Sequence, residues 1–209
     1  MKKLSSSLTN MVVVLTLIAI VAGGILAYVN SITAPQIKII NQEKLDAGIK
    51  EVMGGGDVKV SKNDTVSSTI NGKSKEFVVY YVDDSSSKSL GKAIETSENG
   101  FGGNLKVLVG FNNEGTILGY TILEHSETPG LGAKAGLWFQ KDGKGNIIGM
   151  HPGKNNFTVS KDGGDVDAIT ASTITSRAFL LAIQNAYNEI YGKNSNVTNP
   201  DTEQSKTQN

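Results

Sequence analysis

VDAITASTITSR, residues 166–177, is the most informative stretch of this chain. Five of the seven residues from Thr170 to Ser176 carry a hydroxyl group. Directly after them, apolar side chains recur at spacings of three and four, which is typical of one buried face of an amphipathic helix. Those side chains are Phe179, Ile183, Ala186, Tyr187 and Ile190. The pattern predicts a helix over residues 174–191 that begins at a cluster of hydroxyl groups.

Two interpretations of that cluster are open. Serine and threonine at a helix start accept hydrogen bonds from the unpaired backbone N–H groups of the first turn, so the cluster can be a helix cap. The same N–H groups can instead bind a phosphate. Taken alone, the composition of the stretch favours the cap.

Two further segments carry glycines where a ligand can approach the backbone. LEHSETPGLGAK, residues 123–134, contains the tight-turn pair Pro129-Gly130, and Gly130 and Gly132 leave room for a flat ligand. GFGGNLKVLVG, residues 100–110, is a glycine-rich start to a strand. Taken alone, the first of these segments is an ordinary turn.

Together and in this order, the three segments resemble the FMN-binding subunits of Rnf- and Nqr-type electron-transport complexes, over residues 91–190. In those subunits an aspartate precedes a Ser/Thr-Gly-Ala-Thr core, and the last threonine carries FMN through a phosphoester bond. The matching residue here is Thr173, and the family's Gly-Ala pair is Ala171-Ser172. Alanine adopts a positive φ less readily than glycine, and Ser172 is a second candidate for the attachment point.

The resemblance implies one covalent FMN per chain, and no metal site or catalytic residue is expected in this chain. The first-turn N–H groups are expected to offset the phosphate charge, and Arg177 to reach the phosphate or the ring unless it is a solvated surface residue. Leu131 is expected over one face of the isoalloxazine, and Glu127 either assists proton uptake or faces solvent. The expected FMN-binding residues are Thr173, Thr170, Ser172, Thr175, Ser176, Arg177, Glu127, Thr128, Gly130, Leu131 and Gly132.

Four neighbouring residues have weaker expected roles. Trp138 and Phe139 either stack near the flavin or belong to the core, and His125 is interpreted as structural. In the family, the residue at Asp167 is related to recognition by the attaching enzyme.

The functional resemblance is to G subunits of Rnf-type complexes, which couple electron flow between ferredoxin and NAD to movement of Na⁺ or H⁺. It implies an electron-carrying subunit without independent catalysis. Its expected partners are the other membrane and peripheral subunits, and a flavin transferase for maturation. The C subunit of a Na⁺-translocating NADH:quinone reductase is the alternative. A membrane-anchored non-redox binding domain and a stand-alone flavin reductase belong to other classes.

The composition narrows the chemistry further. The chain has 20 basic and 20 acidic residues, and this balance argues against a nucleic-acid partner. It has no cysteine, which excludes disulfides, thiolate metal sites and Fe–S clusters within this chain. With only His125 and His151, a histidine-built metal site is not expected.

Residues 11–29 form an uncharged apolar run, MVVVLTLIAIVAGGILAYV. At about 1.5 Å per residue this run spans the roughly 30 Å of a membrane's hydrocarbon core. A cleaved signal peptide with Lys2-Lys3 as its basic start, or a buried helix, are the alternatives. The two lysines predict cytoplasmic residues 1–10 and an extracytoplasmic remainder, anchored in the cell (inner) membrane.

After the membrane span, the sequence predicts a single domain between a helix and a tail. A juxtamembrane helix is expected over residues 30–54, a domain over 55–192 and a disordered tail over 193–209. Strands are expected at 76–82, 105–111, 116–123 and 146–150, with a loop at 83–91. The predicted fold class is α+β: an N-terminal transmembrane helix, then one FMN-binding domain with a mainly antiparallel sheet flanked by helices.

Overall fold

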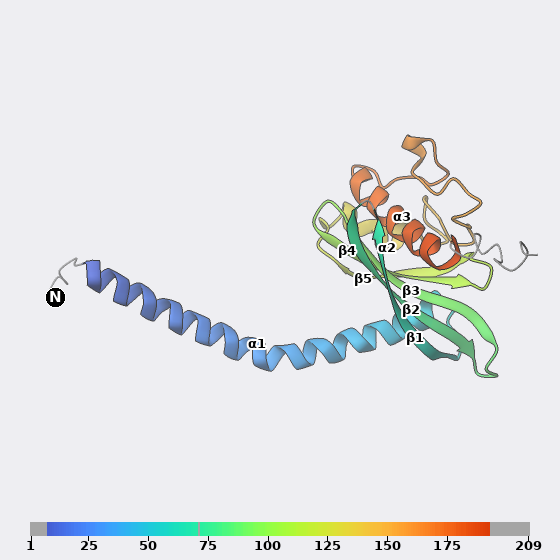
Figure 1. Cartoon of the computed structure of the whole chain (residues 1–209). Coiled ribbons are helices and arrows are strands. Elements are labelled where there is room, and N and C mark those ends of the chain that lie inside the picture. The colour runs from blue at the N-terminus through green and yellow to red at the C-terminus, as the bar shows by residue number, and fades with distance from the viewer. Residues whose placement is uncertain (1–7, 71, 193–209) are drawn as a thin grey trace, which may run out of the picture. The chain divides into compact units, whose positions relative to one another are not determined.

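The computed structural model describes residues 8–70 and 72–192 (Figure 1). The chain divides into two compact units, residues 1–45 and 46–209. The tail predicted over 193–209 and most of the predicted cytoplasmic segment lie outside the described residues.

The first unit is the greater part of a single helix, α1 (Leu8–Val52). This helix contains the predicted membrane span and the predicted juxtamembrane helix up to its end at Val52, two residues before the predicted end. Pro35 lies inside it, where its missing N–H leaves one carbonyl oxygen of the preceding turn without its usual donor. One turn earlier, the hydroxyls of Ser31 and Thr33 donate to backbone carbonyl oxygens. Among the described residues, α1 is the only helix long and apolar enough to cross a membrane.

The second unit is built on a five-stranded antiparallel sheet in which every strand pairs with its neighbour in sequence. The fold class predicted from sequence is confirmed. The strands are β1 (Val58–Ile70), β2 (Lys73–Asp84), β3 (Ser89–Asn99), β4 (Asn104–Asn112) and β5 (Ile117–His125). Three predicted strands overlap β2, β4 and β5, and the predicted loop shortens to the turn between β2 and β3.

The strand predicted at residues 146–150 is wrong, and β1 and β3 were not predicted. Residues 146–150 run beside the start of β5 but in turns, with Ile117 N–H donating to Met150 O and Gly149 N–H to Ile117 O. Most side chains of β1 are exposed and polar, so this edge strand lacks the apolar alternation that marks a half-buried strand.

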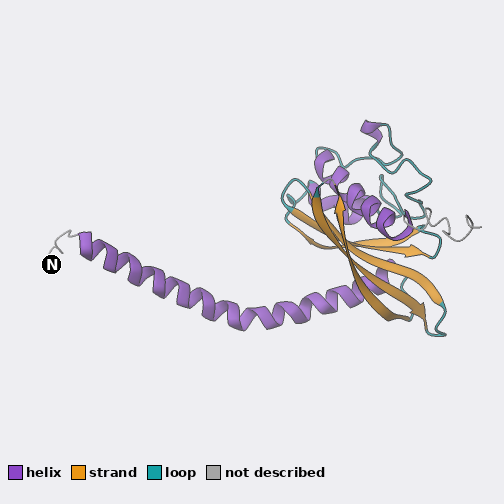
Figure 2. Ribbon diagram, in the orientation of Figure 1, coloured by secondary structure: helices purple, strands orange, loops and turns teal. Residues whose placement is uncertain are grey.

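Helix α3 (Thr173–Tyr187) covers one face of the sheet (Figure 2). Its apolar stripe packs on the alternate β4 side chains that include Val107, Val109 and Phe111, all fully buried. Phe139 stacks on Phe179 with ring centroids 4.4 Å apart, so Phe139 belongs to the core. The helix begins at Thr173, as its periodicity indicates within one residue, and ends in a π-helical turn, η3 (Asn188–Gly192).

The last residues of α1, which belong to the second unit, pack on the opposite face of the sheet. Val52 lies against Gly110 and Gly119, which are paired partners on β4 and β5. A Cβ added at Gly110 would lie 2.3 Å from the Val52 carbonyl oxygen, so glycine is required for this close approach. The sheet is therefore covered on both faces.

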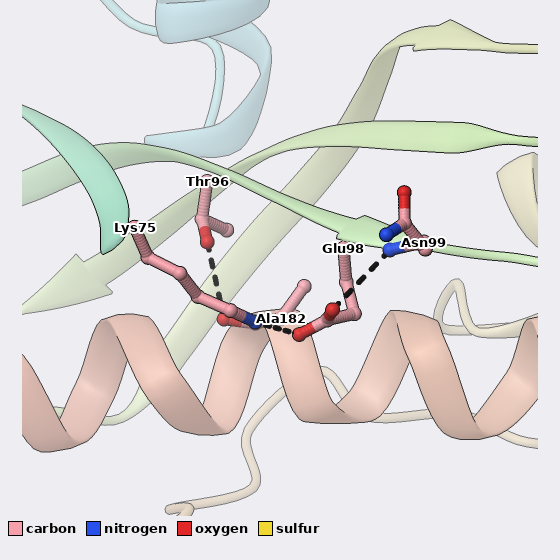
Figure 3. A network of polar contacts seen from close by, with 5 residues as sticks. All are labelled: Lys75, Thr96, Glu98, Asn99 and Ala182. Carbon is pink, nitrogen blue, oxygen red and sulfur yellow. Dashed lines mark hydrogen bonds and ion pairs between the residues drawn. The ribbon is translucent and has the colours of Figure 1, made fainter. Parts of the chain in front are cut away.

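Polar contacts fix β3 against α3 and β2 (Figure 3). The buried Thr96 hydroxyl donates to the Ala182 carbonyl oxygen of α3 at 3.4 Å. Lys75 on β2 forms an ion pair with Glu98 on β3, and Glu98 also accepts from the backbone N–H of Asn99 at 3.3 Å. These contacts hold the end of β3 that leads directly into the glycine-rich turn at residues 100–103.

Candidate functional site

The three glycine- and hydroxyl-rich segments meet at one cavity of about 390 Å³. The turn before β4, the loop after β5 and the start of α3 each contribute to its wall. The volume lies within the range of small-molecule sites, roughly 300–1,000 Å³. The lining residues are Phe101, Glu127, Thr128, Leu131, Gly132, Ala171, Ser172, Thr173, Ile174 and Thr175.

Glu127 joins the three segments through its carboxylate. It is only 6% exposed, so it does not face solvent. One oxygen accepts from the Gly102 backbone N–H at 3.1 Å, and the other accepts from the Thr175 hydroxyl at 2.7 Å. Because a buried carboxylate is costly unless it accepts hydrogen bonds, these two donors explain how the charge is accommodated.

Glycines make room for that carboxylate. A Cβ added at Gly100 would lie 2.1 Å from one Glu127 oxygen, and a Cβ at Gly132 would lie 2.3 Å from the other. Gly132 would also approach the Thr175 hydroxyl to 2.8 Å. These glycines therefore allow the loops to close on Glu127.

The loop after β5 turns tightly and presents Leu131. Gly130 adopts a left-handed φ of 77°, and the Thr128 carbonyl oxygen accepts from the backbone N–H groups of Leu131 and Ala133. Leu131 is 41% exposed and lines the cavity. Thr128 and Gly132 also line it, whereas Gly130 shapes the turn without contributing to the wall.

The hydroxyl cluster is not a conventional helix cap. Ser172 stands at the cap position of α3, but its side chain accepts no hydrogen bond from the first turn. Ala171 before it has a φ of 60°, the left-handed conformation for which the family's glycine is suited. The buried Ser176 hydroxyl instead holds the helix start, accepting from Ile169 N–H and donating to the Ser172 carbonyl oxygen.

The hydroxyl hydrogens of Thr175 and Ser176 are therefore donated inside the protein, to Glu127 and Ser172. Both were among the expected FMN-binding residues. Thr170 is exposed and is not part of the cavity wall. Of the five hydroxyl residues between Thr170 and Ser176, three belong to the cavity wall: Ser172, Thr173 and Thr175.

Thr173 is the first residue of α3 and is half-buried at the cavity wall. Its hydroxyl oxygen accepts a 3.2 Å hydrogen bond from the ammonium group of Lys161. The oxygen thus lies next to a cation and at the positive end of a helix dipole. This arrangement suits an oxygen that bears a phosphate.

Arg177 lies one turn after Thr173 but is directed elsewhere. Its guanidinium forms two 2.7 Å hydrogen bonds with the Asp162 carboxylate. The bidentate contact holds the pKa of Asp162 below its ordinary value and raises that of Arg177. Because the pair is exposed, Arg177 is better described as a surface arginine, the alternative given above, than as a phosphate ligand.

Sequence reasoning missed Phe101, Ile174 and Lys161. Phe101 is 70% exposed and Ile174 is also exposed, and both line the cavity with apolar surface. Both could have been predicted from the sequence, because they lie within the segments that resemble the FMN-binding subunits. Lys161 is twelve residues from Thr173, and nothing in the local pattern indicates their contact. Trp138 donates to the Asp167 carbonyl oxygen and is not one of the residues of the cavity wall.

Comparisons with known proteins identify the family of this chain. The model of a family described as "FMN-binding domain" matches residues 100–188. The G subunit of the ion-translocating oxidoreductase complex of Shewanella oneidensis is 32% identical over 181 residues, covering 82% of this chain and 84% of that protein. The chain belongs to the G subunit family.

A second G subunit and one solved structure are also similar to this chain. The G subunit of Methanosarcina acetivorans is 30% identical over 184 residues, covering 87% of this chain and 94% of that protein. Among solved structures, the C subunit of a Na⁺-translocating NADH-quinone reductase from Parabacteroides distasonis is 22% identical, with a TM-score of 0.40. That alignment covers 61% of this chain and 74% of the other.

The FMN-binding region of this G subunit family member includes every residue of the cavity wall, from Phe101 to Thr175. The wall fits a flavin chemically. Phe101, Leu131 and Ile174 provide apolar surface for a flat ring, and Thr173 with Lys161 provides a polar, positively charged edge for a phosphate.

Proposed function

We propose that this chain is the electron-carrying G subunit of a membrane complex that couples electron transfer between ferredoxin and NAD to ion translocation, with FMN joined through its phosphate to Thr173. The family assignment supports the complex, and the FMN-binding region supports the cofactor. The observation that carries the covalent assignment is the position of Thr173, whose hydroxyl borders both the cavity and a lysine ammonium.

The residues of the chain bind and orient the cofactor. Bound there, FMN supplies one- and two-electron redox chemistry. The first-turn N–H groups of α3 and the Lys161 side chain balance the phosphate charge. Leu131, Phe101 and Ile174 exclude water from the ring.

Ser172 is a weaker candidate for the attachment point than Thr173. It is buried, only 8% exposed, and its backbone is tied on both sides, through its N–H to Ile169 and its carbonyl oxygen to Ser176. Thr173 is the more accessible hydroxyl.

The domain is proposed to lie on the extracytoplasmic side of the membrane. Support comes from Lys2 and Lys3 before the apolar part of α1. Covalent attachment suits this location, because a dissociated flavin would be lost from the cell. The partners are the other subunits of the complex and, for maturation, a flavin transferase. Asp167 is exposed and accessible to such an enzyme, although one carboxylate oxygen accepts from the Ser160 hydroxyl.

The test is peptide mass spectrometry of the chain purified from native membranes, with in-gel flavin fluorescence after denaturation. An FMN phosphoester on Thr173, lost in Thr173→Ala while the fold survives, is the expected result. Modification at Ser172 would keep the function but move the attachment point. An unmodified chain, from a host whose transferase modifies another protein, would refute covalent attachment.

A further inference from the structure

We infer that Lys161 is the cationic ligand of the phosphate carried by Thr173, an inference that rests on the proposed covalent attachment. The starting observation is the 3.2 Å contact between the Lys161 ammonium and the Thr173 hydroxyl oxygen. In a phosphoester that oxygen becomes the bridging atom, and the unesterified phosphate oxygens are bonded to the same phosphorus. Lys161 reaches one of them by side-chain rotation alone, because its amine already lies beside the bridging oxygen.

The backbone of Lys161 is anchored on both sides. Lys161 is the central residue of a 3₁₀ turn, η2 (Ser160–Asp162). After it, Asp162 is fixed to α3 by the bidentate contact with Arg177. Before it, the Ser160 hydroxyl donates to Asp167, and the Ser160 N–H donates to the Val166 carbonyl oxygen at 2.7 Å. The turn is therefore held against the start of α3 by contacts that do not involve Lys161 itself.

Arg177 has a positioning role in this arrangement. Its guanidinium is four residues from Thr173 on α3, and its partner Asp162 is the immediate neighbour of Lys161. The ion pair thus sets the distance between η2 and the first turn of the helix. This explains why an arginine at this place on α3 points away from the cavity.

The acidic side chains of the same segment are occupied by other donors. Asp162 accepts from Arg177, Asp167 from Ser160, and Asp165 from the Asn156 backbone N–H. Among the residues that the structure describes, no ion pair includes Lys161. Its positive charge is therefore directed to the Thr173 side of the turn instead of being neutralised by a neighbouring carboxylate.

A carboxylate elsewhere in the cavity wall disfavours a phosphate beside it. The Glu127 carboxylate lines the wall and is bonded to Thr175. A phosphate is consequently favoured at the Lys161 edge, which leaves the apolar side chains of the cavity for the ring system.

The test compares variants of the full chain produced with the flavin transferase at limiting level, with the modified fraction measured over time by intact mass. Lys161→Gln is expected to slow modification on the order of five- to tenfold, and Lys161→Arg to restore most of it, because arginine keeps the charge. Lys154→Gln, at an exposed lysine in a neighbouring loop, is the matched control and should modify like the wild type. A melting temperature for each variant identifies any loss of folding.

A second measurement tests the contact between Lys161 and the phosphate directly. Modified and unmodified wild-type chains are treated with a limiting amine-acylating reagent, and acylation is quantified at each lysine. Lys161 should react several-fold more slowly in the modified chain, while Lys154 reacts equally in both. Equal modification rates for wild type and Lys161→Gln, with equal labelling of Lys161 in both forms, would overturn the role of Lys161 and leave the proposed function intact. A wild-type chain that is never modified would overturn both.

Discussion

The Thr175 hydroxyl donates a 2.7 Å hydrogen bond to the buried Glu127 carboxylate, joining the first turn of α3 to the loop after β5 across 48 positions of sequence. This contact closes the inner side of the cavity. Thr175, one of the expected FMN-binding residues, thus lines the cavity and also holds its wall together.

Removing the Glu127 carboxylate should destabilise the domain. Glu127→Leu leaves the Gly102 N–H and the buried Thr175 hydroxyl without acceptors, and should lower the free energy of unfolding by about 1–3 kcal/mol. Glu127→Gln is the matched control. Its amide oxygen can accept from Gly102 while its NH₂ donates to Thr175, so it should stay close to wild type. Urea unfolding followed by circular dichroism gives the free energy of unfolding of both variants. Equal losses of stability in the two variants would show that the charge of Glu127, and not its hydrogen bonds, stabilises the domain.

Gly132 should not tolerate a side chain. The Cβ of Gly132→Ala would lie 2.3 Å from Glu127 Oε2 and 2.8 Å from Thr175 Oγ1, so their hydrogen bond must break or stretch. We expect a loss of about 1–3 kcal/mol in unfolding free energy and a lower bound-flavin content.

Gly136→Ala is the control for that substitution. A Cβ at Gly136 meets nothing within 4 Å, and Gly136 lies in the short helix α2 (Ala135–Trp138). It should be neutral or slightly stabilising. Similar behaviour of the two variants in thermal unfolding would contradict the crowding at Gly132.

Ala171→Gly should stabilise the protein. At a φ of 60° alanine is strained, whereas glycine adopts this conformation freely; the gain is partly offset by the greater freedom of glycine in the unfolded chain. The expected net gain is about 0.5–1 kcal/mol. Ala168→Gly, at a position without positive φ, should lose roughly that amount. A destabilised Ala171→Gly variant in the same urea titration would argue against the left-handed backbone.

The ion pair between Asp162 and Arg177 should make part of the stability depend on pH. The hydrogen bond from Arg177 lowers the pKa of Asp162 below its ordinary value of 3.8, so the unfolded chain binds its proton more readily. The contribution is therefore complete above the ordinary value and is lost as pH falls through the lowered one. Melting temperatures of wild type and Asp162→Asn should differ near neutral pH and converge in acid. A difference that persists at the acid end would contradict this assignment.

Elements whose signals are local could be predicted from the sequence. The apolar run within α1, the 3.6-residue periodicity of α3 and the strands β2, β4 and β5 depend on residues close together in the chain. The resemblance to the FMN-binding subunits also lies in contiguous motifs, which is why it could single out Thr173, Leu131 and Gly132, three residues of the cavity wall.

Tertiary structure alone decided which side chains those motifs bring into contact. The bonds of Thr175 to Glu127 and of Lys161 to Thr173 join residues that no periodicity relates. Strand β1 could not be predicted from the sequence because an exposed edge strand carries no apolar alternation. Residues 146–150 have the composition of a strand, but their hydrogen bonds form turns. Hydrogen-bond partners and buried charges depend on packing between distant segments, and that packing is settled only when the whole domain has folded.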